Sequence, residues 1–389
     1  MRQPAPERAA RSGAASRRID PELAASLRRL DGDRVEVTGF ALTSRLLGDA
    51  RIRPGTTGLD ARIPAEWRDS PVLKLFADMI LLSLPPRHGA MRHLVQAWFM
   101  PGEVEKLDGL ITDTADLLID RAAAAAANGP VDFVKEVAVP LPLYVIADLI
   151  GVPERDRTRL LGWCDRLVQA MWHSVDEIAR ATGAALVIAK YFRDLLNGRF
   201  GPVRGLAAQM VEDGSLTEDE TIANLVFLAI AATFTTSDFM SSAAHFACTD
   251  EDFRDALRAD PRPEAAVDEA LRLHPPIKRI LRNAAEDVAI GDTVIPEGTL
   301  IEFDVVRANR DPAVFDEPDR FLPGRPGRRP LSFGHGLHYC AGWALGKAEA
   351  AVLLARFWQR FDHIAPAGEP VPKRHPFQSG LRSVPLALR

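Results

Sequence analysis

One cysteine lies in a glycine-rich loop, in the stretch LSFGHGLHYCAG at residues 331–342. Gly334 and Gly336 permit a tight backbone before Cys340, and Gly342 lets the chain approach closely after it. The next residues, WALGKAEAAVLLARF, predict a helix, so the thiol stands just before a helix N-terminus. Amide donors and the helix dipole stabilise a thiolate there and lower its pKa. We therefore expect Cys340 to be a metal ligand or a nucleophile rather than an inert core thiol.

The cysteine count argues against the remaining alternative, a disulfide. The 389 residues include only Cys164, Cys248 and Cys340, an odd number at wide spacings with no CxxC pair. This pattern favours neither a disulfide framework nor a zinc cage, and it indicates a reducing compartment. We predict a cytoplasmic protein.

Composition limits the possible partners. A hydrophobic content of 47% allows a large core, and a net charge of −5 provides no basic surface for nucleic acid. The sequence contains neither an apolar run of roughly 20 residues, the length of a membrane span, nor a secretion signal. We expect a soluble chain without a membrane partner. Residues 1–18 carry five arginines against one acid and predict a disordered basic tail, with a transit peptide as the alternative.

Long helical patterns dominate the rest of the chain, for example from Glu103 to Ala127 and from Asp176 to Asn197. Strand-like segments are short: RVEVTG from Arg34, a hairpin over 287–305 that turns at 296–298, and the closing SVPLAL. We predict one mainly α domain over 19–389 with small peripheral β-sheets.

The longest predicted helix begins at a capping box formed by Thr217 and Glu220 and runs to about Cys248. Its length of roughly 48 Å would cross a whole domain, and its apolar middle predicts a buried position. One face of this helix carries only small side chains, at Ala231, Ala232, Thr235 and Thr236. Either a flat, bulky group or a neighbouring helix would pack against this face.

Several motifs resemble one known family. FGHGLHYCAG, residues 333–342, is similar to the haem-binding loop FGxGxHxCxG of cytochromes P450, and Glu269 with Arg272 matches their ExxR pair. The segments ANRDPAVFDEPDRF and LPPRHGAMRHLVQAWFMP also resemble parts of that family. The resemblance covers nearly the whole chain in order. It implies a cytochrome P450 fold, mainly α, with a long central helix over the haem.

The resemblance assigns roles to the matching residues. Cys340 would be the thiolate ligand of the iron of haem b, within a loop that includes Phe333 and Gly342. The haem propionates would be held by four further residues, His88, Arg92, Arg282 and His338. Glu269 and Arg272 would organise the fold behind the thiolate loop together with a later arginine, best matched by Arg320.

The central helix departs from the family pattern at the site of proton delivery. The segment IAATFTT, residues 230–236, aligns with the family's AGxDTT or AGxETT, which places Thr235 at the alcohol position. We expect its hydroxyl to bond a carbonyl one turn earlier. The acid position, however, is Phe234, and the usual glycine is Ala232. Ala231 and Phe234 are expected to line the substrate pocket.

The segment HPPIKRILR would pass near the substrate in this family. It carries Lys278 and Arg279, either of which would suit a substrate carboxylate. The alternatives are that these side chains face solvent or reach a propionate.

These features together predict a haem-thiolate oxygenase that activates dioxygen to hydroxylate or otherwise oxidise a small to mid-sized organic substrate, secondary metabolites included. Electrons would come from a separate ferredoxin and ferredoxin reductase, with docking on Arg325, Arg328 and Arg329. The missing acid leaves open a peroxide-using or radical-coupling enzyme. A third reading is a non-catalytic haem-binding recruitment domain.

Overall fold

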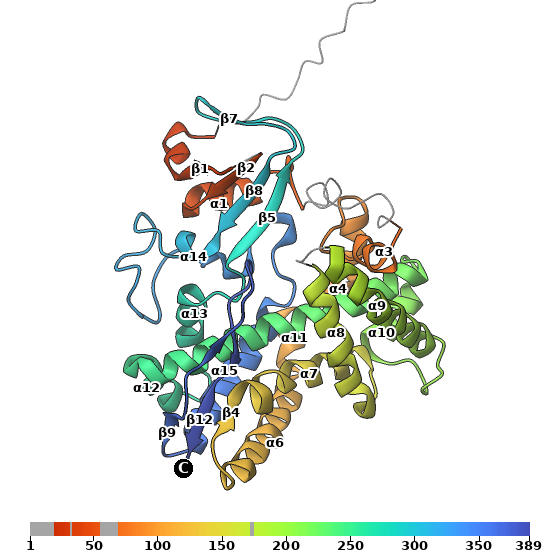
Figure 1. Ribbon diagram of the computed structural model, residues 1–389, viewed down its shortest axis with the longest axis vertical. Coiled ribbons are helices and arrows are strands. Elements are labelled where there is room, and N and C mark those ends of the chain that lie inside the picture. The colour runs from red at the N-terminus through yellow and green to blue at the C-terminus, as the bar shows by residue number, and fades with distance from the viewer. Residues whose placement is uncertain (1–18, 32, 55–68, 172–174) are drawn as a thin grey trace, which may run out of the picture.

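The computed structural model describes residues 19–31, 33–54, 69–171 and 175–389, so the tail predicted for 1–18 lies outside the described residues. Helices form most of the described chain (Figure 1). The α-helices are α1 (Phe40–Leu47), α3 (Pro71–Ala77), α4 (Arg87–Trp98), α5 (Pro101–Glu105), α6 (Asp108–Ala126), α7 (Pro140–Ile150), α8 (Arg157–Met171), α9 (Val175–Leu196), α10 (Gly205–Asp213), α11 (Glu218–Thr249), α12 (Glu251–Ala259), α13 (Glu264–Leu273), α14 (Val305–Ala308) and α15 (Trp343–Arg360). Shorter turns are η1 (Pro21–Ser26), η3 (Val134–Ala138), η4 (Glu154–Asp156), η5 (Leu331–Phe333) and η6 (Gly336–His338).

The described residues form four small sheets. The largest has the strand order β1-β2-β8-β5-β3, and the others pair β4-β12-β9, β10-β11 and β6-β7. The strands are β1 (Leu27–Arg29), β2 (Arg34–Val37), β3 (Ile52–Arg53), β4 (Val131–Asp132), β5 (Arg279–Ala284), β6 (Val288–Ile290), β7 (Thr293–Ile295), β8 (Leu300–Asp304), β9 (Ile364–Pro366), β10 (Val371–Pro372), β11 (Leu381–Ser383) and β12 (Pro385–Leu388). The five-stranded sheet has its own buried cluster, separate from the larger core that the helices build.

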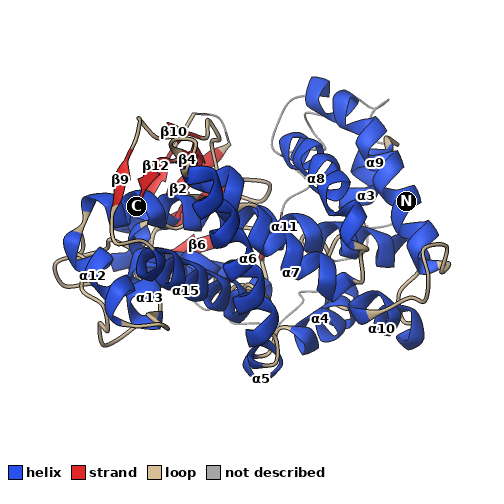
Figure 2. Cartoon of the chain, turned by 90° about the horizontal axis from the view of Figure 1, so that it is seen from below, coloured by secondary structure: helices blue, strands red, loops and turns tan. Residues whose placement is uncertain are grey.

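The central helix forms as predicted. Thr217 and Glu220 make the capping box, and α11 then runs 32 residues across the helical part of the molecule (Figure 1). Viewed from below, α15 lies beside α6 and α13 (Figure 2), and α11 contacts both α15 and α7. By length and hydropathy α11 could span a bilayer, but 78% of its most apolar window is buried inside the protein. The small face is also present, because Ala231, Ala232 and Thr235 remain partly exposed on an otherwise buried segment.

Two sequence expectations need correction. The helix expected from Glu103 to Ala127 is divided into α5 and α6, with a break at 106–107. The hairpin in 287–305 turns at Gly291, which has a φ of +56°, so β6 pairs with β7. The turn at 296–298 instead sends the chain into β8, which pairs with β2 and β5, because its apolar residues are buried in that sheet.

Candidate functional site

The cysteine loop is shaped by two glycines with left-handed backbones. Gly334 and Gly336 have φ values of +74° and +73°, and a side chain at Gly336 would overlap the Leu47 carbonyl. The Cys340 amide donates to the Phe333 carbonyl at 2.9 Å, which closes the loop. α15 begins just after it.

Gly342 leaves open space beside Cys340. Its φ of −89° demands no glycine, yet no described atom lies within 4 Å of the position that a Cβ would take. The expected close approach of protein backbone at Gly342 is therefore wrong for the described chain. A side chain at Gly342 would meet open space rather than another part of the described chain.

The pKa of Cys340 differs from the sequence expectation. Burial raises the pKa of the thiol, and this outweighs the lowering by the Gly342 backbone amide and the Arg92 charge. The expected net lowering by the helix N-terminus is therefore wrong for the protein alone. A bound metal ion would reverse this balance, because a coordinating thiol loses its proton to the metal charge.

The ExxR pair is buried behind this loop. Arg272 donates two hydrogen bonds to Glu269, at 2.8 and 2.9 Å, and their side chains are 1% and 5% exposed. Arg325 and the Leu322 amide also donate to Glu269. Burial alone would raise the pKa of Glu269, but the hydrogen bonds from Arg272, Arg325 and Leu322 outweigh burial and lower it. The arginine that joins the ExxR pair is thus Arg325 rather than the expected Arg320. The side chain of Arg320 is exposed and pairs with Glu317.

Further hydrogen bonds connect this network to the loop. Arg272 donates to the carbonyls of Asn309 and Pro318 at 2.9 and 2.6 Å. Asn309 accepts from the Leu331 amide and donates to the Ser332 hydroxyl. The ion pair therefore fixes the entry to the cysteine loop, which is the structural role that the sequence predicted for it.

The four predicted propionate ligands come together from α4, β5 and the cysteine loop. The rings of His88 and His338 have centroids 4.5 Å apart, and Arg92 donates to the Tyr339 carbonyl at 2.6 Å. Arg282 donates to its neighbour's carbonyl. Buried His88 Nδ1 and His338 Nε2 have no hydrogen-bond partner within the described chain.

Electrostatics in this cluster indicate a missing anion. Burial lowers the pKa of His338 to about 3, and the charges of Arg282, His88 and Arg92 add smaller contributions in the same direction. Burial lowers the pKa of Arg282 to about 10. No carboxylate of the described residues pairs with any of the four side chains. Four donors without an acid suit two carboxylates of a bound group, as the propionates of a haem would supply, so these residues fit a haem.

The central part of α11 packs against α15, the helix that follows the cysteine loop, where a Cβ on Gly346 would lie 3.4 Å from Thr236 Oγ1. Thr235 donates to the Ala231 carbonyl at 2.8 Å, as predicted. Phe234 is 8% exposed, and the ammonium of Lys373 lies 6.0 Å from its ring centroid. Phe234 therefore brings an apolar ring, and no acid, to the position next to Thr235.

Lys278 and Arg279 have different surroundings. Arg279 pairs with Glu302 at 2.9 Å and with Glu36 at 3.4 Å, and both carboxylates are buried. Its charge is already neutralised, so the expectation that Arg279 meets a substrate carboxylate is not supported. Lys278 donates to the His375 carbonyl at 3.0 Å, and no carboxylate among the described residues pairs with its charge.

Sequence reasoning missed an ion pair beside Phe234. Asp238, 1% exposed on α11, pairs with Lys373, which follows β10. The signal was available in part, because an aspartate within a buried apolar helix requires a partner. Nothing in the local sequence indicated that the partner lies 135 residues away.

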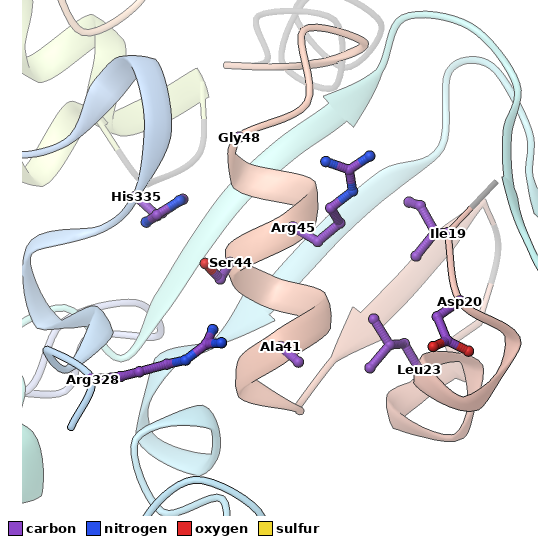
Figure 3. Close-up of a pocket in the computed structure, with 9 residues that line it drawn as sticks. All are labelled: Ile19, Asp20, Leu23, Ala41, Ser44, Arg45, Gly48, Arg328 and His335. Carbon is purple, nitrogen blue, oxygen red and sulfur yellow. The ribbon is translucent and has the colours of Figure 1, made fainter. Parts of the chain in front are cut away.

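An open pocket of about 520 Å³ lies near the cysteine loop, between that loop, α1 and the first described residues. Figure 3 shows Arg328 extending toward Ser44 on α1, with His335 of the loop on the same side of the helix. Arg328, Arg329 and His335 are exposed, and so is Leu337, at 49%. Arg325 is mostly buried on Glu269, which removes it from the predicted docking residues.

Known proteins are similar to this chain in sequence and in fold. A family model for cytochrome P450 matches residues 261–388. Cytochrome P450 BJ-3 of Bradyrhizobium diazoefficiens is 31% identical over 363 residues, covering 88% of this chain and 84% of the relative. The cytochrome P450 monooxygenase PikC of Streptomyces venezuelae is 32% identical over 346 residues, which cover 85% of this chain and 82% of the relative. Among solved structures, the chain matches the crystal structure of P450BioI in complex with hexadec-9Z-enoic acid ligated acyl carrier protein. The TM-score is 0.87 at 27% identity, and the match covers 95% of this chain and 97% of the solved one.

The chain belongs to the cytochrome P450 family. It is an oxidoreductase of the monooxygenase type that uses a haem iron, and bacterial enzymes of this type generally take electrons from redox partners.

Proposed function

We propose that this protein is a haem-thiolate monooxygenase that binds haem b through Cys340 and inserts oxygen into a small to mid-sized organic substrate. The observation that carries the proposal is the cluster of His88, Arg92, Arg282 and His338, which has no acid of the described chain to pair with and lies beside the cysteine loop. When bound, the haem iron would supply the activation of dioxygen.

The chain's own residues would do the remaining work. The Gly342 amide and the Arg92 charge favour the thiolate form of Cys340. Phe333 holds the loop closed through its carbonyl. On the opposite side, Ala231, Thr235 and Phe234 would form the wall against which substrate lies. The Thr235 hydroxyl would hold a water molecule, since its oxygen can still accept while it donates to Ala231.

The test of ligation is the absorbance spectrum of the reduced, CO-treated protein. Wild type should show the thiolate signature, and Cys340→Ser should lose it together with nearly all activity. A serine variant that keeps the wild-type spectrum would show that Cys340 is not the ligand.

The substrate class is proposed to include organic acids of secondary metabolism. Lys278 supports this, because no carboxylate of the described chain pairs with its charge. Burial and, to a smaller extent, the charge of Arg279 lower the pKa of Lys278. Spectral titration with matched acid and methyl-ester ligands measures the contribution. The acid should bind more tightly to wild type, and Lys278→Met should remove the difference. Equal affinities in wild type would contradict the role of Lys278.

We propose a ferredoxin, reduced by a ferredoxin reductase, as the electron donor in the cytoplasm. The docking surface would consist of Arg328, Arg329, His335 and Leu337, a basic rim around one exposed apolar side chain. Reduction by an acidic ferredoxin should slow as salt increases, because exposed charges are screened. Arg328→Glu should slow it further at low salt. A rate independent of salt would exclude this docking mode.

A second candidate function is favoured by Phe234 alone. An enzyme that receives hydrogen peroxide needs no carboxylate at position 234 to protonate its oxidant. Turnover with peroxide would then exceed turnover with ferredoxin and its reductase at equal enzyme concentration. The reverse result would favour the dioxygen-using enzyme.

A further inference from the structure

Asp238 is a buried carboxylate one helical turn from Phe234 and Thr235, the residues proposed above to line the substrate space. It follows Phe234 by four residues and Thr235 by three, spacings that place side chains next to each other along one side of a helix. Its side chain is 1% exposed, and Oδ2 accepts no hydrogen bond from any residue that the structure describes. A buried oxygen in this state costs stability unless water or a ligand pairs with it.

The C-terminal hairpin of β10 and β11 covers this carboxylate. A Cβ on Gly380 would lie 2.6 Å from Asp238 Cγ, so the hairpin backbone passes directly over the acid. The Leu381 amide donates to Ser241 on α11 at 2.9 Å, and the Lys373 amide donates to Gly380 across the hairpin. The hairpin is thus attached to α11 at Asp238 itself, through Lys373, and one turn later at Ser241.

Lys373 connects Asp238 with the surface. Its ammonium pairs with Asp238 Oδ1 and lies 6.0 Å from the Phe234 ring centroid, while its side chain is 25% exposed. The path from solvent to Asp238 therefore follows Lys373 and reaches α11 beside the position that lacks its acid.

The protonation state of Asp238 suits an exchangeable proton. Burial raises the pKa of Asp238 to about 6, partly offset by the charge and hydrogen bond of Lys373, which is the charged group acting on it in the described chain. A carboxyl group with this pKa is present in both forms near neutral pH, as proton transfer requires.

We propose that Asp238, held by Lys373, supplies protons to the Thr235 side of α11 in place of the carboxylate missing at position 234. This inference rests on the proposed monooxygenase function. The proton leaves Asp238 Oδ2 for a water molecule that also bonds the Thr235 hydroxyl. A proton from solvent, passed along Lys373, then restores the acid, and no electrons move in either transfer.

The test separates proton supply from structural support. Asp238→Asn keeps the shape and an oxygen that accepts from Lys373, but it carries no acidic proton. Product formed per electron consumed should fall by about fivefold or more, and far more than turnover with peroxide does. The solvent deuterium isotope effect on electron-driven turnover should increase. Asp156→Asn is the matched control, because Asp156 is also buried but bonds Tyr191, away from α11.

A second readout needs no turnover. Infrared difference spectra of the substrate-free holoprotein against pH should contain a carboxyl band that titrates near pH 6 in wild type and in Asp156→Asn and is absent in Asp238→Asn. Absence of that band from wild type would overturn the proposal.

The remaining outcomes are also decisive. Wild-type coupling in Asp238→Asn, or an equal loss in peroxide-driven turnover, would overturn the proton route while the CO spectrum still supported the proposed function. A wild type without the thiolate spectrum would overturn both.

Discussion

Two buried carboxylates near the candidate haem space, Glu269 behind the cysteine loop and Asp238 on α11, differ in how completely they are paired, and we call their surroundings the paired and the unpaired side. Behind the cysteine loop, Glu269 and Arg272 use nearly all of their donors and acceptors in a closed network. On α11, Asp238 Oδ2 is buried and has no partner within the described chain. A closed network gives rigidity, which an iron ligand requires, whereas unpaired groups hold water and exchange protons. We therefore expect the Glu269 network to stay fixed and Asp238 to exchange protons.

The largest expected effect is on the paired side. Arg272→Leu leaves Glu269 buried with Arg325 as its remaining charged partner and should lower the free energy of unfolding by about 3–5 kcal/mol. Chemical denaturation measured by circular dichroism checks this value. Arg320→Leu is the control and should change stability by at most about 0.5 kcal/mol, because its side chain is exposed. Similar losses in both variants would restore Arg320 to the network.

The next effect is a pH dependence on the unpaired side. Because the pKa of Asp238 rises from 3.8 to about 6 on folding, the acid form stabilises the fold. This contribution is complete below about pH 4 and is lost as the pH rises through about 6. At about 1.4 kcal/mol per unit the loss amounts to about 3 kcal/mol. Thermal unfolding between pH 4 and 7 should show this decline in wild type and a flatter profile in Asp238→Asn. If the stability of wild type and of Asp238→Asn fell in parallel, the titrating group would be a residue other than Asp238.

Replacing Phe234 should make the unpaired side more like the family pattern. A carboxylate in Phe234→Glu would lie near Lys373, which favours its charged form. We expect product per electron to rise by roughly threefold to tenfold, below the effect of an optimally placed acid, and peroxide-driven turnover to rise less. Thr235→Ala should lower coupling in both backgrounds. Tight coupling in wild type that survives Thr235→Ala would show that neither residue of this pair controls protonation, and if it also survived Asp238→Asn it would identify the substrate as the proton source.

The smallest effects are expected at the two other cysteines. Cys164 is 1% exposed, and burial raises the pKa of its thiol, so Cys164→Ala removes a packed side chain. This variant should cost about 1 kcal/mol of stability. Cys248→Ala should cost less, because the Cys248 side chain is partly exposed. Neither variant should change the CO spectrum. A changed spectrum would implicate a second thiol in ligation.

Local motifs explain which parts of this protein could be predicted. The capping box at Thr217, the extent of α11 and the Thr235 hydrogen bond depend on residues within a few positions of one another, and all three form as predicted. The cysteine loop is also local, because Gly334 and Gly336 dictate its backbone. The gathering of His88 with His338 was predicted only through the family resemblance, since 250 residues separate them.

Tertiary packing decided the remainder. The partner of Glu269 is Arg325 rather than Arg320, and Arg279 is neutralised by Glu36 and Glu302 from neighbouring strands. The raised pKa of Cys340 reflects burial by the whole fold and outweighs the local effect of the helix terminus. Asp238 and Lys373 meet only because the C-terminal hairpin folds onto α11. The physical reason is the same in each case: charge pairing and desolvation depend on which distant segments pack together, and spacing along the chain carries no record of that.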